Sequence, residues 1–400
     1  MKVLIVASLF APWRLGGAEV VAESTARALA DLGHEVCVLT LSPDQVTSQE
    51  QCSGYQVRRT PLLNIYSLQE MGRATILQRI RWHMKDRWNN AMHDAFSNEL
   101  ALLKPDIALL HNIAGFSISI YQALSSRSVP FVQVLHDHYF CCLYSTMYQS
   151  GRSCEHQCLR CKLVRRTHSE TTQFASGVIG VSSFILERIR SQGLFSDMPC
   201  KVIHNLATIP AVIDSLNNSF ADNSGSRYTF GYLGILNESK GVIDLIDAFK
   251  ISAGPLDRLK LAGFLENESR KIRMAINSDP RIEYLGVVDR ELFFSSIDCL
   301  VVPSRVPEAF GLVAQEAWFR GVPVIVSNQG ALPEAIGSAP ATYIYDVHDS
   351  DGLSTALQNL LADRNRWQRY PAISALNYQS MKRSWAESYE AFLQRFAFRN

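Results

Sequence analysis

Two carboxylates near the carboxyl end of the chain, Glu308 and Glu316, have the spacing that most suggests chemistry. The two carboxylates of a glycoside hydrolase stand roughly 5 to 9.5 Å apart, whereas eight residues of helix advance about 12 Å. The spacing therefore favours a clamp on hydroxyl groups at two ends of one elongated ligand. A helix cap at the first position and a solvated charge at the second would give the same pattern.

The turn between the carboxylates is suited to an anion. The amides that follow Phe310, at Gly311 and Leu312, would point out of a helix start, where hydrogen bonding and the helix dipole both favour a phosphate. The pattern predicts a strand at 300–302, a loop at 304–310, a helix at 312–319 and a strand at 324–326. This is the repeating piece of a doubly wound α/β domain, and a sugar nucleotide has the matching sugar, diphosphate and ribose.

The segment PEAFGLVAQEAWFRGVPVIVSNQGALPEAI, at 307–336, resembles the donor-site signature of the retaining nucleotide-sugar glycosyltransferases of family 4. The resemblance extends over almost the whole chain. It implies the GT-B fold, with two doubly wound Rossmann-like domains facing a cleft. It also implies that Glu308 holds donor sugar hydroxyls, that Glu316 holds the ribose, that the amides after Phe310 hold the diphosphate, and that catalysis requires no cofactor.

Length and composition fit two globular domains. We expect an amino-terminal domain over 1–205 that binds the acceptor, a nucleotide-sugar domain over 206–378, and a final helix over 379–400 that crosses back. The polar segment 216–227 is the best linker candidate. With 39 basic and 38 acidic residues, nothing favours a nucleic-acid partner. Nine irregularly spaced cysteines and no long apolar run indicate the cytoplasm.

The amino-terminal half contributes two further candidates. A first strand at 3–8 leads into a loop ending in Gly16 and Gly17, where the backbone can approach a ligand closely, although a plain tight turn is the alternative. His136 follows a buried strand, the place where ligands sit in open sheets. In the resembling family the glycine loop lies beside the donor phosphate and this histidine reaches the donor sugar. A core histidine bonded to backbone carbonyls is the alternative.

A lysine before a predicted helix at 242–251 is placed to neutralise a leaving diphosphate. In the resembling family the loop over 234–241 carries an arginine as well as this lysine. Here Lys240 matches, but Ile235 stands at the arginine position. Loss of one cation there would cost about 2 to 4 kcal/mol of transition-state stabilisation, judged from other preorganised donors.

A cysteine-rich loop over 138–166 stands apart from these motifs. Cys142, Cys154, Cys158 and Cys161 have the spacing C-x11-C-x3-C-x2-C. Four soft ligands in a cytosolic chain suggest a structural zinc knuckle, with free or redox-paired thiols and an iron–sulfur centre as alternatives. A subset of the resembling family carries a similar insertion.

A helical pattern runs over 72–103, and its part at 73–88 mixes arginine and lysine with Trp82 and Trp88. Such a stretch suits peripheral contact with an anionic membrane at the inner face of the cell membrane. A solvated helix whose tryptophans face the core is the alternative.

These observations together predict a retaining glycosyltransferase. The donor would be a UDP- or GDP-sugar, and the acceptor a hydroxyl of a glycan or lipid-linked glycan in surface polysaccharide synthesis. Two other functions stay open: a weakly active or non-catalytic sugar-nucleotide-binding subunit of a polysaccharide assembly machine, and a nucleotide-sugar epimerase on the same fold.

Overall fold

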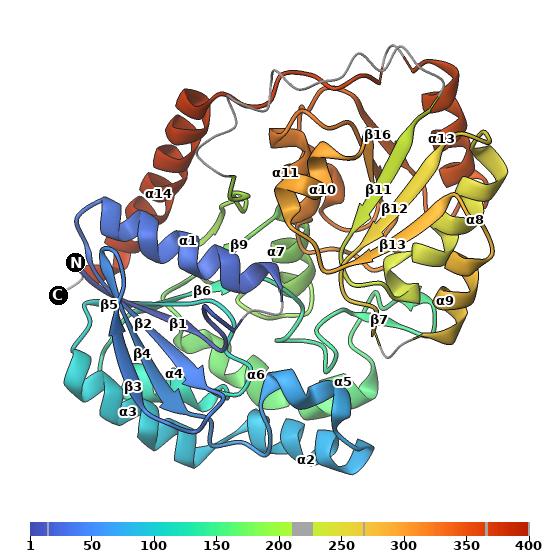
Figure 1. The fold of residues 1–400 in the computed structure, drawn as a ribbon. Helices are drawn as coiled ribbons and strands as arrows, with labels where there is room; N and C mark the ends of the chain where they lie inside the picture. The colour runs from blue at the N-terminus through green and yellow to red at the C-terminus, as the bar shows by residue number, and fades with distance from the viewer. Residues whose placement is uncertain (14–15, 210–226, 267–268, 365–366, 399–400) are drawn as a thin grey trace. The chain divides into compact units, whose positions relative to one another are not determined.

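The computed structural model describes residues 1–400 except 14–15, 210–226, 267–268, 365–366 and 399–400, so nearly all of the predicted linker lies outside the described residues. The chain divides into two compact units, each built on its own sheet (Figure 1). The first comprises 1–147, 154–206 and 380–400, and the second comprises 148–153 and 207–379. Their strands are mostly buried runs of valine, isoleucine and leucine, as parallel sheets covered on both faces require.

The sheet of the first unit has the strand order β10-β9-β6-β5-β1-β2-β4-β3, and only β3 is antiparallel to its neighbour. β1 pairs with β2 on one side and β5 on the other, so the strand order reverses there. The elements of this unit are β1 (Lys2–Ala7), α1 (Gly17–Asp31), β2 (Glu35–Ser42), β3 (Ser48–Gln51), β4 (Tyr55–Pro61), η1 (Leu68–Arg73), α2 (Ile76–Arg87), α3 (Asn90–Leu103), β5 (Ile107–Leu110), α4 (Ser119–Ser126), β6 (Phe131–Leu135), α5 (Leu159–Val164), α6 (Arg166–Thr171), η2 (Thr172–Phe174), β9 (Gly177–Gly180), α7 (Ser183–Arg190), β10 (Cys200–Val202) and most of α14 (Ala375–Ala397).

The helical pattern over 72–103 is confirmed for most of its length, but it is divided among η1, α2 and α3. Two side-chain caps divide the stretch. Thr75 accepts a hydrogen bond from the amide of Gln78 and begins α2, and Asn89 accepts one from Met92 and begins α3. Such caps satisfy the unpaired amides of a new helix start. The helical periodicity continues across the cap at Asn89, and only the capping residue marks the break.

The last helix, α14, belongs to the first unit from Ser380 onward, although it follows the second unit in sequence. Four aromatic side chains of this helix, Trp385, Tyr389, Phe392 and Phe396, are all buried. A β-carbon at Gly177 of β9 would lie 2.9 Å from the Phe396 ring, so the helix packs directly against strand backbone. The indole of Trp385 donates to the carbonyl oxygen of His204 at 2.9 Å.

The sheet of the second unit is fully parallel, in the order β13-β12-β11-β14-β15-β16. Counted from the unit's first long strand this is 3-2-1-4-5-6, the order of dinucleotide-binding folds, and its switch point lies between β11 and β14. The elements are β7 (Tyr148–Gln149) and β8 (Arg152–Ser153), which form a hairpin, then β11 (Thr229–Leu233), η4 (Glu238–Lys240), α8 (Val242–Ser252), β12 (Arg258–Ala262), α9 (Arg270–Asn277), β13 (Ile282–Gly286), α10 (Arg290–Ser295), β14 (Cys299–Val302), α11 (Leu312–Phe319), β15 (Val324–Ser327), α12 (Leu332–Ile336), β16 (Thr342–Tyr345) and α13 (Gly352–Ala362).

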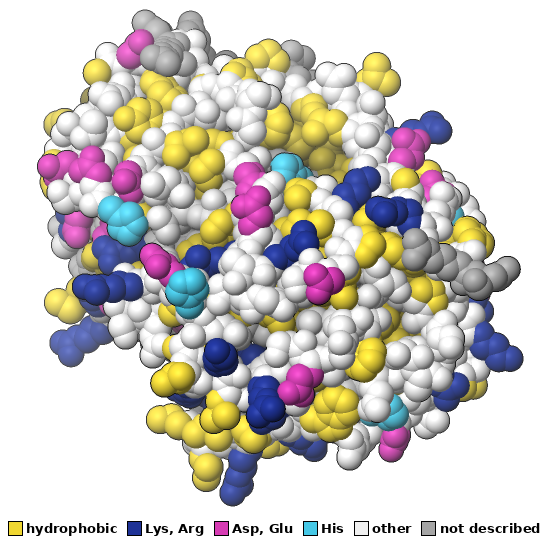
Figure 2. Space-filling view, turned by 180° about the vertical axis from the view of Figure 1, so that it is seen from behind, with side chains coloured by type: hydrophobic (Ala, Val, Ile, Leu, Met, Phe, Trp, Pro, Cys, Tyr) yellow, Lys and Arg dark blue, Asp and Glu magenta, His cyan; other side chains and the backbone are white. Residues whose placement is uncertain are grey.

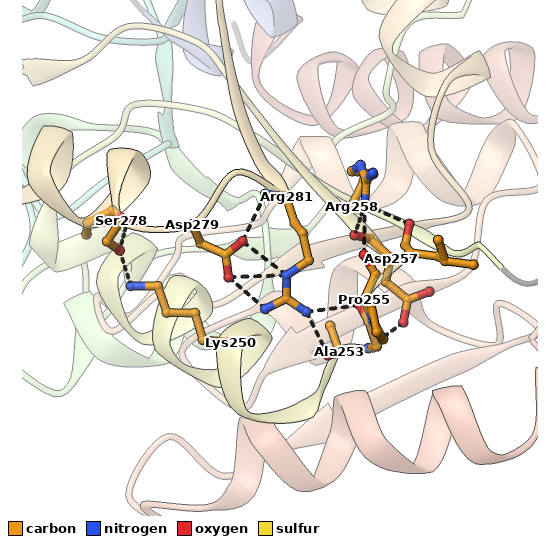
Figure 3. Close-up of polar contacts among 11 residues, drawn as sticks. Lys250, Ala253, Pro255, Asp257, Arg258, Ser278, Asp279 and Arg281 are labelled. Atoms are coloured by element: carbon orange, nitrogen blue, oxygen red, sulfur yellow. Dashed lines mark hydrogen bonds and ion pairs between the residues drawn. The ribbon is translucent and has the colours of Figure 1, made fainter.

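A polar network lies at the amino ends of β12 and β13 (Figure 3). Just before β13, Arg281 pairs with Asp279 at 2.6 Å and donates to the carbonyl oxygens of Ala253 and Gly254, which follow α8. A guanidinium so placed satisfies two carbonyl oxygens just beyond the end of the helix. The amino edge of the sheet is thus used for stability, and the loops at the carboxyl edge remain for ligands.

We expect Phe392→Ala to lower the free energy of unfolding by about 3–5 kcal/mol, because it empties a fully packed site between α14 and the first sheet. Phe398, 69% exposed beyond the same helix, provides the matched control, and Phe398→Ala should change stability by less than about 0.5 kcal/mol. Urea unfolding monitored by circular dichroism measures both. Equal losses for the two variants would contradict the described docking of α14.

Candidate functional site

Two loops meet at the switch point of the second sheet. One follows β11 and spans 234–241, and the other follows β14 and spans 303–310. Gly241 has a φ of +72°, and a β-carbon there would lie 1.9 Å from the carbonyl oxygen of Pro303. The amide of Arg305 also donates to the carbonyl oxygen of Ser239 at 3.0 Å. Only glycine allows the first loop to lie this close to the second.

Lys240 and Glu308, one from each loop, form an ion pair with an Nζ–Oε1 distance of 2.6 Å. The lysine loop is fixed by Asn237, whose side chain accepts from the amide of Lys240 at 2.9 Å. Both side chains of the pair stay partly exposed, at 30% and 21%. An ion pair of this kind contributes roughly 0.2–1 kcal/mol. Incoming phosphate or hydroxyl groups can therefore replace it at little cost.

The backbone of Glu308 is held by a glycine of the same sequence signature. Gly330 has a φ of +64°, and a β-carbon there would lie 2.3 Å from the carbonyl oxygen of Glu308. That oxygen accepts a hydrogen bond from the amide of Ala331 at 2.8 Å. The signature segment thus positions its own carboxylate by packing the loop after β15 against the loop after β14.

Glu316 lies in the second turn of α11, and its side chain is only 8% exposed. Both of its carboxylate oxygens accept from the guanidinium of Arg290, the first residue of α10, and its carbonyl oxygen accepts from Arg320 at 2.9 Å. Burial raises the pKa of Glu316, and the charges of Arg290 and Arg320 oppose that rise. The carboxylate is thus buried behind an arginine that is itself half exposed.

Sequence reasoning missed Arg290. It lies 26 residues before Glu316, and no spacing pattern joins them. The two helices that carry them start after β13 and β14, which are not neighbouring strands. The contact therefore follows only from the three-dimensional arrangement of the unit.

The turn between the two carboxylates begins α11 at Leu312, as predicted. Gly311 precedes the helix with a φ of +108°, a conformation that favours glycine. Phe310 is buried below the turn. The turn is thus fixed by a buried ring on one side and a left-handed glycine on the other.

Ile235 lies at the same edge of the sheet, in the loop after β11, and is 41% exposed. Its carbonyl oxygen accepts from the hydroxyl of Tyr232 at 2.7 Å, which fixes the backbone of the loop. This position therefore presents an apolar side chain where the resemblance has a cation.

In the first unit, His136 follows β6 and lies against His111, which follows β5. Nε2 of His136 is 2.8 Å from Nδ1 of His111, and the rings are stacked with centroids 5.0 Å apart. Burial lowers the pKa of both, that of His136 to about 3. The pair is therefore neutral near pH 7, and can exchange hydrogen bonds but offers no charge. The sequence analysis singled out His136 but not its contact with His111.

Gly16 and Gly17 lie at the start of α1, which begins at Gly17. The amide of Gly16 donates to the carboxylate of Glu19 at 2.8 Å, so the helix supplies its own anion to that amide. Both glycines are exposed.

The four cysteines of the predicted zinc knuckle are all free, and Cys161 interacts with two of the others. A hydrogen bond with the Cys161 thiol, supported by backbone amides at 144, 146 and 147, lowers the pKa of Cys142, and Cys161 also contacts Cys158. Among the residues that the structure describes, no three His, Cys, Asp or Glu side chains form a group ready to hold a metal ion. The sulfur chemistry suits zinc, and the zinc knuckle stays a prediction.

Two family models match the chain, Glycosyltransferase Family 4 over residues 15–207 and Glycosyl transferases group 1 over residues 217–373. An uncharacterized 42.6 kDa protein in the cps region of Klebsiella pneumoniae is 24% identical over 357 residues, 88% of this chain and 92% of that protein. An uncharacterized glycosyltransferase of Methanocaldococcus jannaschii is 25% identical over 382 residues, 91% of this chain and 90% of that protein.

Solved structures share the fold at lower identity. Sucrose-phosphate synthase from Thermosynechococcus elongatus superposes with a TM-score of 0.73 at 17% identity, over 99% of both chains. HepE from Anabaena, solved in complex with UDP and glucose, superposes with a TM-score of 0.65 at 18% identity, over 98% of this chain and 99% of that chain.

Two doubly wound units whose sheets are largely parallel define the GT-B fold class. The two family models between them match nearly the whole chain, which belongs to the group 1 glycosyltransferases with a family 4 amino-terminal domain. The protein is thus an enzyme that transfers glycosyl groups.

The stability of the protein should fall as the pH drops below about 6.5, because burial lowers the pKa of five histidines in the first unit. Unfolded histidines take up protons near pH 6.5 that the folded ones do not. Each such histidine therefore lowers the free energy of unfolding by up to about 1.4 kcal/mol for each pH unit below that value. Urea unfolding at pH 7.5, 6.5 and 5.5 measures this slope. The five are His83, His111, His136, His138 and His168.

His168→Gln should reduce that slope, because it removes one of the titrating rings. Glutamine can still accept the hydrogen bond that Arg165 donates to His168 at 2.9 Å, so the fold is kept. The exposed His156, changed to glutamine, is the control and should leave the slope unchanged. A stability that is flat between pH 7.5 and 5.5 would refute the neutral state of these buried rings.

If the cysteine loop holds zinc, protein purified without chelator should contain about one zinc per chain by elemental analysis. Cys142→Ser and Cys161→Ser should each abolish that content, whereas Cys52→Ser, which changes a half-buried cysteine outside the loop, should not. A zinc content below about half an equivalent, with all nine thiols titrating, would rule out the knuckle.

Proposed function

We propose that this glycosyltransferase moves a sugar from a nucleoside diphosphate sugar, with UDP or GDP as the nucleotide, to a hydroxyl acceptor, with retained anomeric configuration. The acceptor is a glycan or lipid-linked glycan of surface polysaccharide synthesis, and the reaction takes place on the cytoplasmic side of the membrane. No metal ion takes part in the chemical step.

One observation carries the donor assignment: Lys240 and Glu308 meet at the switch point of the second sheet, beside the start of α11. Open α/β sheets bind ligands at that point. A cation at that point can pair with a diphosphate, and a carboxylate can accept hydrogen bonds from sugar hydroxyls. The amides at the helix start can donate to phosphate oxygens. The solved complexes of HepE with UDP and with UDP-glucose support a donor of this class.

Catalysis in this proposal is positioning plus stabilisation of the leaving group. Lys240 leaves Glu308 and neutralises the departing diphosphate, while Glu308 accepts hydrogen bonds from the donor sugar. Glu316 accepts from the ribose, which takes over part of the pairing that Arg290 now provides. His136 is assigned to the sugar by family resemblance, and its neutral ring suits a hydrogen-bonding role rather than a cationic one.

Two rival functions predict different products. An epimerase would release the epimer of its sugar nucleotide, and a binding subunit would leave the sugar nucleotide intact. A slow hydrolysis of donor in the absence of acceptor, with the sugar otherwise unchanged, separates the proposed transferase from both. Failure of UDP and GDP to bind at millimolar concentration would remove the donor assignment.

Lys240→Ala should lower turnover by about 10²–10³-fold and weaken donor binding much less, because the lysine acts on charge that develops in the transition state. Glu316→Ala should instead weaken nucleotide binding, measured by calorimetry with UDP and GDP. Lys250→Ala, at the amino edge of the sheet (Figure 3), and Glu283→Ala, at an exposed position of β13, are the matched controls. If Lys240→Ala behaves like Lys250→Ala, the lysine has no part in catalysis.

A further inference from the structure

Helix α2 turns an apolar face away from the protein. Four of its apolar side chains, Ile76, Leu77, Ile80 and Met84, are between 46% and 79% exposed. At about 100° per residue they fall within a stripe about 100° wide, on the side opposite Trp82. Trp82 is 1% exposed and donates to the carbonyl oxygen of Tyr66 at 3.0 Å. The tryptophan thus fixes the helix to the core and leaves the larger apolar face outside.

Helix α5, from the cysteine-rich loop, extends this face. It packs beside α2, and its Leu159 and Leu163, one turn apart, are 88% and 69% exposed. Cys161 points to the buried side between them. Together the exposed apolar residues of the two helices form what we name the α2–α5 surface, made of Ile76, Leu77, Ile80, Met84, Leu159 and Leu163.

Basic side chains surround these apolar ones. The exposed charges of the two helices are Arg79, Arg81, Lys85, Arg160 and Lys162. The one acidic residue of α2, Asp86, is fully buried, and α5 has none. Figure 2 shows apolar and basic side chains interspersed in the lower part of that view, where Figure 1 draws α2 and α5. The surface therefore combines exposed apolar area with charges that are all positive.

We infer that the α2–α5 surface docks on an anionic phospholipid bilayer. An apolar stripe with flanking lysine and arginine matches the boundary between acyl chains and anionic headgroups. The long basic side chains can reach the phosphates while the apolar ones enter the hydrocarbon. A protein partner fits less well, because lysines flank the surface and none of its six apolar residues is aromatic, both unlike the centre of a protein interface. No helix among the described residues is long and apolar enough to span a bilayer, so this contact is peripheral.

The inference does not depend on the proposed donor or acceptor. It would place the enzyme at the bilayer surface, where an acceptor joined to a lipid lies in the same plane. Of the two tryptophans in the predicted membrane stretch, Trp82 has no part in the contact because it is buried. The apolar contribution comes instead from aliphatic residues, a third of them on α5.

Vesicle flotation of the full chain tests the inference. Wild-type protein should float with vesicles of phosphatidylglycerol and phosphatidylcholine, should stay below with phosphatidylcholine alone, and should lose binding as salt rises. The double variant Ile80→Glu with Met84→Glu, and separately Leu163→Glu, should each reduce partitioning by about tenfold or more. Arg81→Glu with Lys85→Glu should reduce it by a similar factor, since each basic residue near such a surface contributes about fivefold.

Ile251→Glu is the matched control, because Ile251 is 71% exposed on α8 of the second unit. It should float like wild type, and all variants should keep wild-type thermal unfolding and UDP binding. Wild-type protein that stays below with anionic vesicles, or variants that float like Ile251→Glu, would overturn the inference. A change in oligomeric state with no flotation would overturn it in favour of self-association. Failure of the wild-type protein to bind UDP would contradict the proposed function and leave the docking inference unchanged.

Discussion

The close packing of two loop backbones at Gly241 and Pro303 holds the candidate site of the second unit together. A side chain at Gly241 would collide with a carbonyl oxygen, and the loop would have to lift away from β14. Lys240 and Glu308 stand on either side of that contact, so their 2.6 Å pairing depends on the absence of a β-carbon next door. Gly330 has the same role for the backbone of Glu308. The positions of these charged side chains thus depend on two neighbouring glycines, at which no side chain would fit.

The site's charges are already satisfied by one another. Lys240 pairs with Glu308, and Glu316 pairs with Arg290. The Lys240–Glu308 pair is partly exposed and therefore weak, so a ligand with both phosphates and hydroxyls can exchange with it at small net cost. Pairing also keeps the buried Glu316 from standing alone in a poorly solvated place, which would cost several kcal/mol. Ile235 leaves the loop after β11 with one cation fewer than the family pattern, so the proposed reaction depends more heavily on Lys240.

Much of this could be predicted from the sequence, because parallel strands and helix starts have strong local signals. The helix at Leu312, the strands around it and the buried face of α14 follow from periodicity and from glycine and proline. The partners of the predicted residues could not be found in this way. Arg290 reaches Glu316 from a non-neighbouring strand–helix connection, and His111 meets His136 only because β5 and β6 are adjacent. The break between α2 and α3 escaped because hydrophobic periodicity continues across the cap at Asn89.

The return of α14 to the first sheet has a consequence for how the chain is made. Synthesis on the ribosome runs from the amino end, so the strand backbone at Gly177 emerges long before the rings of Phe392 and Phe396 that cover it. Until then an apolar strip of the nascent first unit faces water, while the second unit, whose sheet is already complete, can fold. The first unit, although synthesised earlier, is therefore complete only when α14 has been made. A nascent chain stalled before that point carries an exposed apolar strip that chaperones would recognise.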